Sequence, residues 1–221
     1  MVIAVDGPGA VGKSTVAGLV ASSVGLPHLD TGSTYRAAGL AALRSDVALD
    51  DVSGILAALD AVDIRIVDGV VSIDGVDVTE ALRSDDVTKA SSVVATHPEV
   101  RSRIVALQRS WVEDRGGSAV VEGRDIGTVV FPDAPVKIYL TARPEIRAAR
   151  RSGDAEAADK SRDEIAVELA ARDHTDSTRK ASPLRPADDA EIIDTSDLSI
   201  DEVVEQVLAL VDGVGYRESW L

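Results

Sequence analysis

Cysteine is absent from the sequence of 221 residues, and phenylalanine, tryptophan and tyrosine together make up only 3% of it. Without cysteine the chain has no disulfide, thiolate metal site or cysteine nucleophile, which suits a reducing compartment. No basic segment precedes an apolar one, and no uninterrupted apolar run approaches the ~18 residues that a membrane span needs. We expect a cytoplasmic protein with no membrane partner.

Positive charge is also scarce, because 23 lysines and arginines oppose 38 aspartates and glutamates and the formal net charge is −15 at pH 7. Such a chain repels phosphate at long range and lacks the basic face that nucleic acids require, so we expect no nucleic-acid partner. Arginines nevertheless outnumber lysines by 18 to 5, and several lie in predicted loops beside Gly, Asp or Ser. A guanidinium can bind one phosphate with two hydrogen bonds, which favours small anionic ligands.

Residues 7 to 14 read GPGAVGKS, a complete GxxxxGK[ST] motif between the apolar run 2–5 and a helix-like stretch. Its glycines let several N–H groups converge on one point, and the helix that follows adds its positive N-terminal end. Lys13 and Ser14 can serve the β- and γ-phosphates and Mg²⁺. The motif predicts a P-loop that binds a nucleoside triphosphate.

Hydrophobic residues make up 45% of the chain, enough to fill the core of one large α/β domain with insertions or of two small ones. In the first half we predict a buried strand over 2–6, a helix over 13–24 that ends at Gly25, an edge strand over 26–30, helices over 34–44 and 52–60, and an antiparallel insert over 63–78. The turn pairs Asp68-Gly69 and Asp74-Gly75 separate the strands of this insert.

The second half repeats the alternation of strands and helices. We predict helices over 85–95 and 98–115, strands over 119–121, 136–140 and 190–194, a helix from Pro144, a polar helical pair on the surface over 152–172 and a last helix over 200–211 with a capping box at Ser199. The five strands outside the insert predict a parallel core sheet.

Several arginines adjoin predicted strand ends, where ligand sites of open α/β sheets gather. We expect four of them to face the P-loop from four separate loops: Arg36, Arg124, Arg172 and Arg179. A simple triphosphate hydrolase needs fewer cations. The set therefore favours a second anionic substrate.

Four segments then carry a resemblance: GPGAVGKS at 7–14, DTGSTYR at 30–36, EGRDIGTVVFPDAPVKIYL at 122–140 and ARDHTDSTRKASPL at 171–184. With them the chain resembles the bacterial cytidylate kinases, a family of P-loop nucleoside-monophosphate kinases, over nearly its whole length. The insert at 63–78 is similar to their enlarged monophosphate-binding region. The resemblance implies a three-layer P-loop NTPase-type α/β fold with a five-stranded parallel core at 1–34, 116–149 and 173–221, a monophosphate-binding domain at 35–115 and a helical lid at 150–172.

The resemblance also implies a function, namely transfer of the ATP γ-phosphate to CMP or dCMP by a monomer with Mg²⁺ as cofactor. The implied catalytic residues are Lys13, Arg36, Arg124 and Arg179. The implied ATP-binding residues are Gly7, Pro8, Gly9, Ala10, Val11, Gly12, Lys13, Ser14, Thr15, Arg147 and Arg151. The implied CMP-binding residues are Thr31, Tyr35, Arg36, Ser92, Arg101, Arg124, Asp125, Arg172, Asp176 and Arg179. Ser14 is expected to bind Mg²⁺ directly, and Glu122 through water.

The chemistry of the implied base pocket discriminates between pyrimidines. The Asp125 carboxylate can accept from the N4 amino group of cytosine, whereas uracil would present its O4 acceptor to the same carboxylate. UMP is therefore expected to be a poor substrate. Short polar contacts to the pentose, from Asp176 and Arg172, should admit dCMP.

Alternatives remain at this point. Another small P-loop kinase, acting on UMP, AMP or shikimate, is one; a GTPase-like regulatory switch is another, although the chain has no NKxD signature and its DxxG lies near the C-terminus at 212–215. Glu122 could instead be a solvated strand-end carboxylate, and Arg147 and Arg151 could be surface charges. The three histidines lack metal-ligand spacing, and His28 is predicted to be a packed or half-exposed ring.

Overall fold

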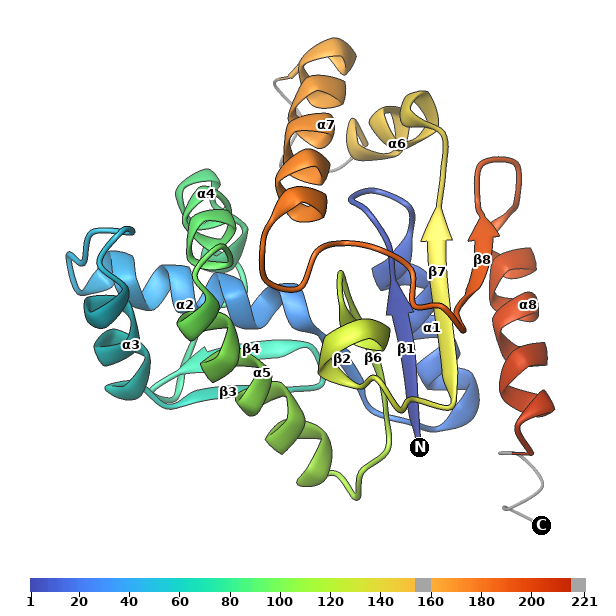
Figure 1. Cartoon of the computed structure of the whole chain (residues 1–221), viewed down its shortest axis with the longest axis horizontal. Helices are drawn as coiled ribbons and strands as arrows, with labels where there is room; N and C mark the ends of the chain where they lie inside the picture. The colour runs from blue at the N-terminus through green and yellow to red at the C-terminus, as the bar shows by residue number, and fades with distance from the viewer. Residues whose placement is uncertain (154–159, 216–221) are drawn as a thin grey trace. The chain divides into compact units, whose positions relative to one another are not determined.

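The computed structural model describes residues 1–153 and 160–215 and shows a mixed α/β protein (Figure 1). Five strands form one sheet in the order β2-β6-β1-β7-β8, and their bounds are β1 Val2–Asp6, β2 His28–Asp30, β6 Ala119–Gly123, β7 Val136–Thr141 and β8 Glu191–Asp194. Strand β1 pairs in parallel with β6 and β7, and β7 pairs in parallel with β8. The predicted five-stranded core is confirmed, as is the edge position of the strand that contains Asp30.

The chain divides into two compact units, which are described separately here. The first unit contains Met1–His28 and Val112–Leu221, and the second contains Leu29–Trp111. The bounds of the monophosphate-binding domain and of the lid stay predictions. Residues 154–159, which belong to the predicted lid, lie outside the described residues.

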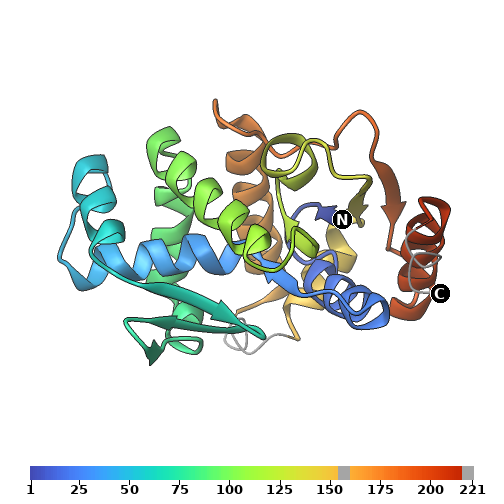
Figure 2. The same ribbon diagram turned by 90° about the horizontal axis from the view of Figure 1, so that it is seen from below.

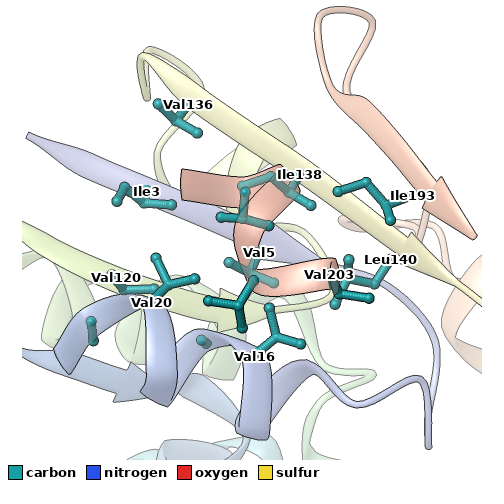
Figure 3. Packing of buried hydrophobic residues seen from close by; sticks show 14 of the residues in the cluster. Ile3, Val5, Val16, Val20, Val120, Val136, Ile138, Leu140, Ile193 and Val203 are labelled. Carbon is teal, nitrogen blue, oxygen red and sulfur yellow. The ribbon is translucent and has the colours of Figure 1, made fainter. Parts of the chain in front are cut away.

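The core of the first unit lies between the sheet and two helices, α1 (Lys13–Val24) and α8 (Ile200–Gly213) (Figure 3). Alternate residues of β7 are buried, as a period of two requires for a strand with one face on the core. Helix α1 starts after Gly12, at φ 92°, and ends before Gly25, at φ 66°; both left-handed positions suit glycine. The predicted capping box of α8, between Ser199 and Glu202, is present.

The remaining helices of the first unit differ from prediction in two places. The loop after β6 contains a single turn of π-helix, η2 (Ile126–Val130), and β7 leads into α6 (Pro144–Arg151). Helix α7 (Arg162–Thr178) continues six residues beyond the predicted surface pair over 152–172. Its Ile165 is buried against Ala148, so this segment is anchored by a small apolar cluster and is not purely a surface pair.

The second unit holds α2 (Thr31–Arg44), α3 (Val52–Asp60), η1 (Ala81–Arg83), α4 (Asp85–Val94), most of α5 (Pro98–Glu113) and the antiparallel sheet β3 (Ile64–Val67), β4 (Val70–Ile73) and β5 (Val76–Asp77). Asp68 and Gly69 have φ of 49° and 80°, and Asp74 and Gly75 have 52° and 78°, the positive values that two-residue hairpin turns need. The predicted insert is therefore confirmed. Strand β4 packs along α2 (Figure 2).

Helix α2 begins three residues earlier than predicted. The Asp30 carboxylate accepts a hydrogen bond from the Gly32 backbone N–H at 2.8 Å and caps the helix, which therefore starts at Thr31. The DTGSTYR segment is thus a cap and the first turn and a half of a helix. Arg36 is a helical residue.

The longest described helices are α7 and α5, with 17 and 16 residues. Across residues 1–153 and 160–215, no helix combines the length and apolarity needed to cross a membrane.

Two helix glycines differ sharply in their surroundings. A Cβ at Gly39 of α2 would lie 3.0 Å from the backbone nitrogen of Ser91 and 3.1 Å from Cβ of Ala90, both in α4. A Cβ at Gly18 of α1 would meet only the His28 ring, at the ordinary distance of 3.8 Å. The absence of a side chain at Gly39 lets α2 and α4 approach closely.

Adding one methyl group at each position separates helix propensity from packing. We expect Gly18→Ala to raise the free energy of unfolding by up to about 1 kcal/mol, because alanine is the better helix former. Gly39→Ala should lower it by about 1 kcal/mol or more, because α4 must move. Urea unfolding of both variants measures this. Equal stabilisation by the two substitutions would show that the α2–α4 contact is not tight.

Candidate active site

The P-loop has the backbone shape that its glycines allow. Gly7, Ala10 and Gly12 all have positive φ, at 146°, 61° and 92°. A Cβ on Gly7 would lie 2.2 Å from the carbonyl oxygen of Leu140 in β7, so no other residue fits where β1 leads into the loop. The loop ends at the N-terminus of α1, whose free N–H groups and dipole favour a bound anion.

The two reactive side chains of the motif have different environments. Lys13 is buried, and its Nζ donates to the carbonyl oxygen of Pro8 at 2.6 Å, so the side chain turns back over the loop. Ser14 is exposed, and its hydroxyl donates to Oε2 of Glu122 at 3.0 Å. The loop thus presents one ammonium group and one hydroxyl on the side where a triphosphate would bind.

Glu122 is only 2% exposed, so the alternative that it is a solvated carboxylate is wrong. It lies one residue before the end of β6, beside Val5 of β1 in the sheet. Its Oε1 is 3.1 Å from Nε2 of His28. The half-exposed ring predicted at His28 is present, and it has a partner that the sequence did not indicate.

A pocket of about 420 Å³ opens on the P-loop within the first unit. This volume lies in the range of small-molecule sites. Its lining comprises Ala10, Val11, Gly12, Lys13, Ser14, Thr15, Val16, Arg150, Arg151, Thr195, Leu198, Ser199, Ile200 and Val203. Six of the predicted ATP-binding residues, from Ala10 to Thr15, and Arg151 thus share one cavity.

Arg150 and Thr195 were not among the predicted site residues. Arg150 donates through Nη1 to Thr195 Oγ1 at 2.8 Å and through Nη2 to the Thr195 carbonyl at 2.6 Å, and its Nη1 also reaches the Val11 carbonyl at 3.4 Å. The spacing rule that selected Arg147 and Arg151 also places Arg150, at i+3 from Arg147, on the same helix face. Nothing comparable in the sequence marks Thr195.

Arg147 is buried against the P-loop. Its Nε donates to the Gly9 carbonyl at 2.7 Å, and its Nη2 pairs with Asp173 of α7. The backbone N–H of Gly9 in turn points at the Asp173 carboxylate, 3.4 Å away. A carboxylate therefore lies where the loop offers an N–H group to an anion.

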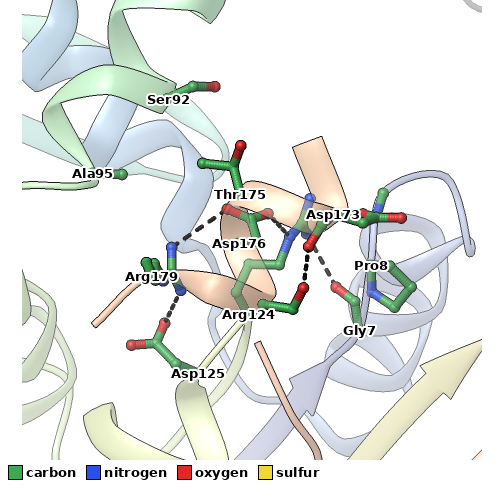
Figure 4. Close-up of polar contacts among 12 residues, drawn as sticks. Gly7, Pro8, Ser92, Ala95, Arg124, Asp125, Asp173, Thr175, Asp176 and Arg179 are labelled. Carbon is green, nitrogen blue, oxygen red and sulfur yellow. Dashed lines mark hydrogen bonds and ion pairs between the residues drawn. The ribbon is translucent and has the colours of Figure 1, made fainter. Parts of the chain in front are cut away.

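Four charged side chains of the first unit form a second cluster (Figure 4): Arg124, Asp125, Asp176 and Arg179. Arg124 Nε donates to Asp176 at 2.9 Å, and its Nη1 donates to the Gly7 carbonyl at 3.1 Å. Arg179 lies 3.4 Å from Asp176 and 3.8 Å from Asp125. The cluster thus directly adjoins the start of the P-loop.

The expectation that the four arginines come from four loops is wrong. Arg36 lies in α2 because Asp30 caps that helix early, and Arg172 lies in α7 because that helix runs to Thr178. Arg179 is the residue that ends α7, which leaves Arg124 as the loop arginine of this set. Two helices therefore carry most of the predicted acceptor cations, and Asp176, in the last turn of α7, is paired with Arg179.

The other predicted CMP-binding residues lie in the second unit. The Arg101 guanidinium stands 5.2 Å from the centroid of the Tyr35 ring, a cation–π contact, and its Nη1 donates to the Ala95 carbonyl at 3.3 Å. Ser92 donates to the Thr88 carbonyl at 3.2 Å, and Thr31 is buried at the start of α2. Tyr35 and Arg101 are thus brought together.

Asp6 connects β1 to the loop that carries Arg124 and Asp125. Its two carboxylate oxygens accept the backbone N–H groups of Ile126 and Gly127 at 2.8 and 2.7 Å. Burial raises the pKa of Asp6 to about 6, although the two N–H groups and Lys13 act in the opposite direction, and Asp125 adds to the rise. No motif in the sequence marks Asp6 as part of the site.

The oxygen groups beside the P-loop fit a hard cation. Among the residues that the structure describes, no three His, Asp or Glu side chains cluster as a metal site. Mg²⁺ in nucleotide sites takes one or two protein oxygens and fills its shell with water and phosphate. The Ser14 hydroxyl and the Glu122 carboxylate, in contact at 3.0 Å, supply such a pair.

Comparison with known proteins adds a family to this geometry. The model of the family described as cytidylate kinase matches residues 3–213. A cytidylate kinase from Pelotomaculum thermopropionicum is 48% identical over 98% of this chain and 97% of its own length. One from Burkholderia multivorans is 44% identical, over 97% of this chain and 94% of its own.

Solved structures support the fold alone. An uncharacterised protein from Eubacterium ventriosum aligns with a TM-score of 0.52 at 13% identity, over 96% of this chain and 98% of its own. A sugar kinase from Janibacter sp. HTCC2649 aligns with a TM-score of 0.50 at 16% identity, over 96% and 94%.

The raised pKa of Asp6 makes a prediction about stability. A carboxyl group whose pKa rises on folding stabilises the folded state when protonated, and this contribution is lost as pH rises from about 4 through about 6. When the pH is lowered from 8 to 4.5, we expect the free energy of unfolding of wild type to rise by about 2 kcal/mol relative to that of Asp6→Asn, because a pKa shift of one unit corresponds to about 1.4 kcal/mol. Denaturant unfolding of both proteins at the two pH values tests this. A difference that does not vary with pH would contradict it.

Proposed function

This chain belongs to the cytidylate kinase family, and we propose that it transfers the γ-phosphate of ATP to CMP or dCMP through the residues described above. The reaction gives ADP and CDP or dCDP. The observation that carries the assignment of residues is the P-loop pocket together with a partly buried arginine–carboxylate cluster that adjoins the start of the loop, both within one unit.

The donor nucleotide is assigned to the pocket of about 420 Å³. Backbone N–H groups of residues 9–15 and the Lys13 ammonium bind its β- and γ-phosphates, as P-loops do. Arg147, which holds the Gly9 carbonyl, and Arg151, which lines the pocket, are assigned to the donor nucleotide, and Arg150 holds the loop through Val11. The apolar side chains of Leu198, Ile200 and Val203 suit the nucleoside end of ATP.

The acceptor phosphate is assigned to Arg36, Arg124 and Arg179. Phosphoryl transfer depends mainly on positioning and charge neutralisation, and cations between two polyanions provide both. The attacking atom is a phosphate oxygen already ionised at neutral pH, so the protein needs no general base. Asp176 partners two of these arginines, which keeps their partly buried charges compensated.

Base and sugar recognition is assigned to the residues that the family resemblance implies. Asp125 accepts from the cytosine N4 amino group while Arg101 donates toward O2 and N3, with Ser92 as a further polar contact. Asp176 and Arg172 contact the pentose, and Thr31 and Tyr35 complete the acceptor site. Discrimination against UMP follows from the carboxylate, which has no proton to offer to O4.

When bound with the nucleotide, Mg²⁺ would neutralise charge between the β- and γ-phosphates. Ser14 would hold it directly, and Glu122 would hold its water ligands. The alternative of a UMP or AMP kinase, or of a regulatory NTPase, is not favoured. A monomeric state and a cytoplasmic location stay predictions from the sequence.

Substrate selection tests the function directly. With Mg²⁺-ATP, we expect ADP release to depend on CMP or dCMP, with UMP and AMP at least about 100-fold less efficient, as a lost pair of base contacts implies. A coupled ADP-release assay measures kcat/KM for each acceptor. Faster turnover of UMP or AMP would overturn the base assignment, and equal ADP release without any acceptor would overturn the kinase assignment.

Asp125→Asn tests the base contact with little change of shape. We expect kcat/KM for CMP to fall by about 10- to 100-fold and the preference over UMP to narrow, since the amide now offers a donor to O4. Affinity for ATP should persist. Asp133→Asn, at an exposed position eight residues along the chain, is the matched control and should leave both substrates unchanged. Unaltered discrimination by Asp125→Asn would remove Asp125 from the base pocket.

A further inference from the structure

A buried carboxylate of the first unit is held from two sides. Glu122 Oε2 accepts the Ser14 hydroxyl at 3.0 Å, and Oε1 lies 3.1 Å from Nε2 of His28. Three elements thereby meet at one side chain: Ser14 belongs to α1, Glu122 to β6 and His28 to β2. His28 has no role in the site as assigned above.

The direction of the Ser14 hydrogen bond matters for a metal ligand. A hydroxyl has one proton, and Ser14 donates it to Glu122, which as a carboxylate can only accept. The lone pairs of the Ser14 oxygen are then left for a ligand in the P-loop pocket, which Ser14 lines. Glu122 therefore sets the orientation that a cation-binding hydroxyl needs.

The position of Glu122 depends in turn on its other oxygen. A glutamate has three side-chain torsions, and a buried carboxylate is costly unless its oxygens are hydrogen-bonded. His28 meets this need with Nε2, and the acceptor-only carboxylate requires that this nitrogen carry the proton. The ring is also limited on its other side, since its Nδ1 lies near Gly18 of α1.

We propose that His28 is a positioning residue for the metal-dependent step: it fixes Glu122, and Glu122 orients the Ser14 hydroxyl toward the Mg²⁺ of the donor nucleotide. The inference rests on the proposed function, in which Ser14 binds that Mg²⁺. Removing a side chain that hydrogen-bonds to a metal ligand, without touching the metal itself, commonly weakens metal binding by about 10- to 100-fold.

A second histidine provides a matched control. His97 Nε2 lies 2.8 Å from the Leu49 carbonyl oxygen, in the second unit, and neither residue belongs to the assigned site. Replacing it by leucine also removes one partly buried imidazole hydrogen bond. Any general effect of that loss on stability should therefore appear in His97→Leu as well.

The test is a binding measurement separate from turnover. Isothermal calorimetry gives the Kd of a non-hydrolysable ATP analogue with Mg²⁺ and with EDTA, and the ratio of the two reports how much the metal strengthens binding. We expect His28→Leu to reduce this ratio about 10-fold or more while the Kd in EDTA stays within about 2-fold of wild type. His28→Gln, whose amide nitrogen can replace Nε2, should restore most of the ratio, and His97→Leu should not change it.

Each outcome decides the inference. An unchanged ratio in His28→Leu, or a wild type that gains nothing from Mg²⁺, overturns it. If His28→Leu does not fold, His28→Gln and the shorter His28→Asn replace it, and equal ratios in these two variants overturn the inference. CMP turnover is measured in parallel, so that loss of the ratio in an enzyme that ignores CMP would support the role of His28 while refuting the proposed acceptor.

Discussion

A buried cation needs an anionic partner, and this requirement organises the first unit. Arg147 pairs with Asp173, Arg124 with Asp176, and Arg179 with Asp176 and Asp125. Removing one partner of such a pair would leave an uncompensated charge in a poorly solvated place, which is far more costly than a broken surface pair. Helix α7 supplies two of the three carboxylates, one turn apart, which makes its position important to several arginines at once.

Backbone geometry meets the same requirement at the end of β1. Gly7 passes so close to the Leu140 carbonyl that no side chain fits, and Asp6, one residue earlier, receives the N–H groups of Ile126 and Gly127. The donor loop and the loop with Arg124 and Asp125 are thus fixed to each other through one side chain. The π-helical turn η2 begins directly after Asp125, and the Asp6 carboxylate accepts hydrogen bonds from the first two N–H groups of this turn.

Local signals made much of the fold predictable from sequence. Gly25, the Asp-Gly pairs and the Ser199 capping box act within a few residues, and the structure has each where it was predicted. The P-loop pocket follows from one motif in the same way. The predicted start of α2 is too late. Residues up to Asp30 have a strand pattern, and Gly32 suggests a loop, but the Asp30 carboxylate caps the helix directly after the strand.

Contacts between distant segments could not be predicted, because nothing local encodes them. His28 lies 94 residues from Glu122 in the chain, and Asp6 lies 120 from Ile126. Arg150 could not be singled out because a helix pattern defines only a face, and Arg147, Arg150 and Arg151 all lie near that face. In each case the residue type indicates what chemistry the polar side chain can perform, but its role depends on the partner that the fold brings to it.

The arrangement of carboxylates also bears on how readily substrate could replace them. Arg179 lies 3.4 Å from the Asp176 carboxylate and 3.8 Å from that of Asp125, longer than the 2.7–2.9 Å of a strong charge-assisted hydrogen bond, while its Nε donates to the Ser182 carbonyl at 2.6 Å. Arg124, at 2.9 Å from Asp176, is held more firmly. Within the proposed function, an incoming phosphate would therefore replace carboxylate partners most readily at Arg179, whose two ion pairs are the longer ones. Asp176 would then be released to face the sugar, so the side chain that pairs with Arg124 and Arg179 becomes part of the recognition of the acceptor.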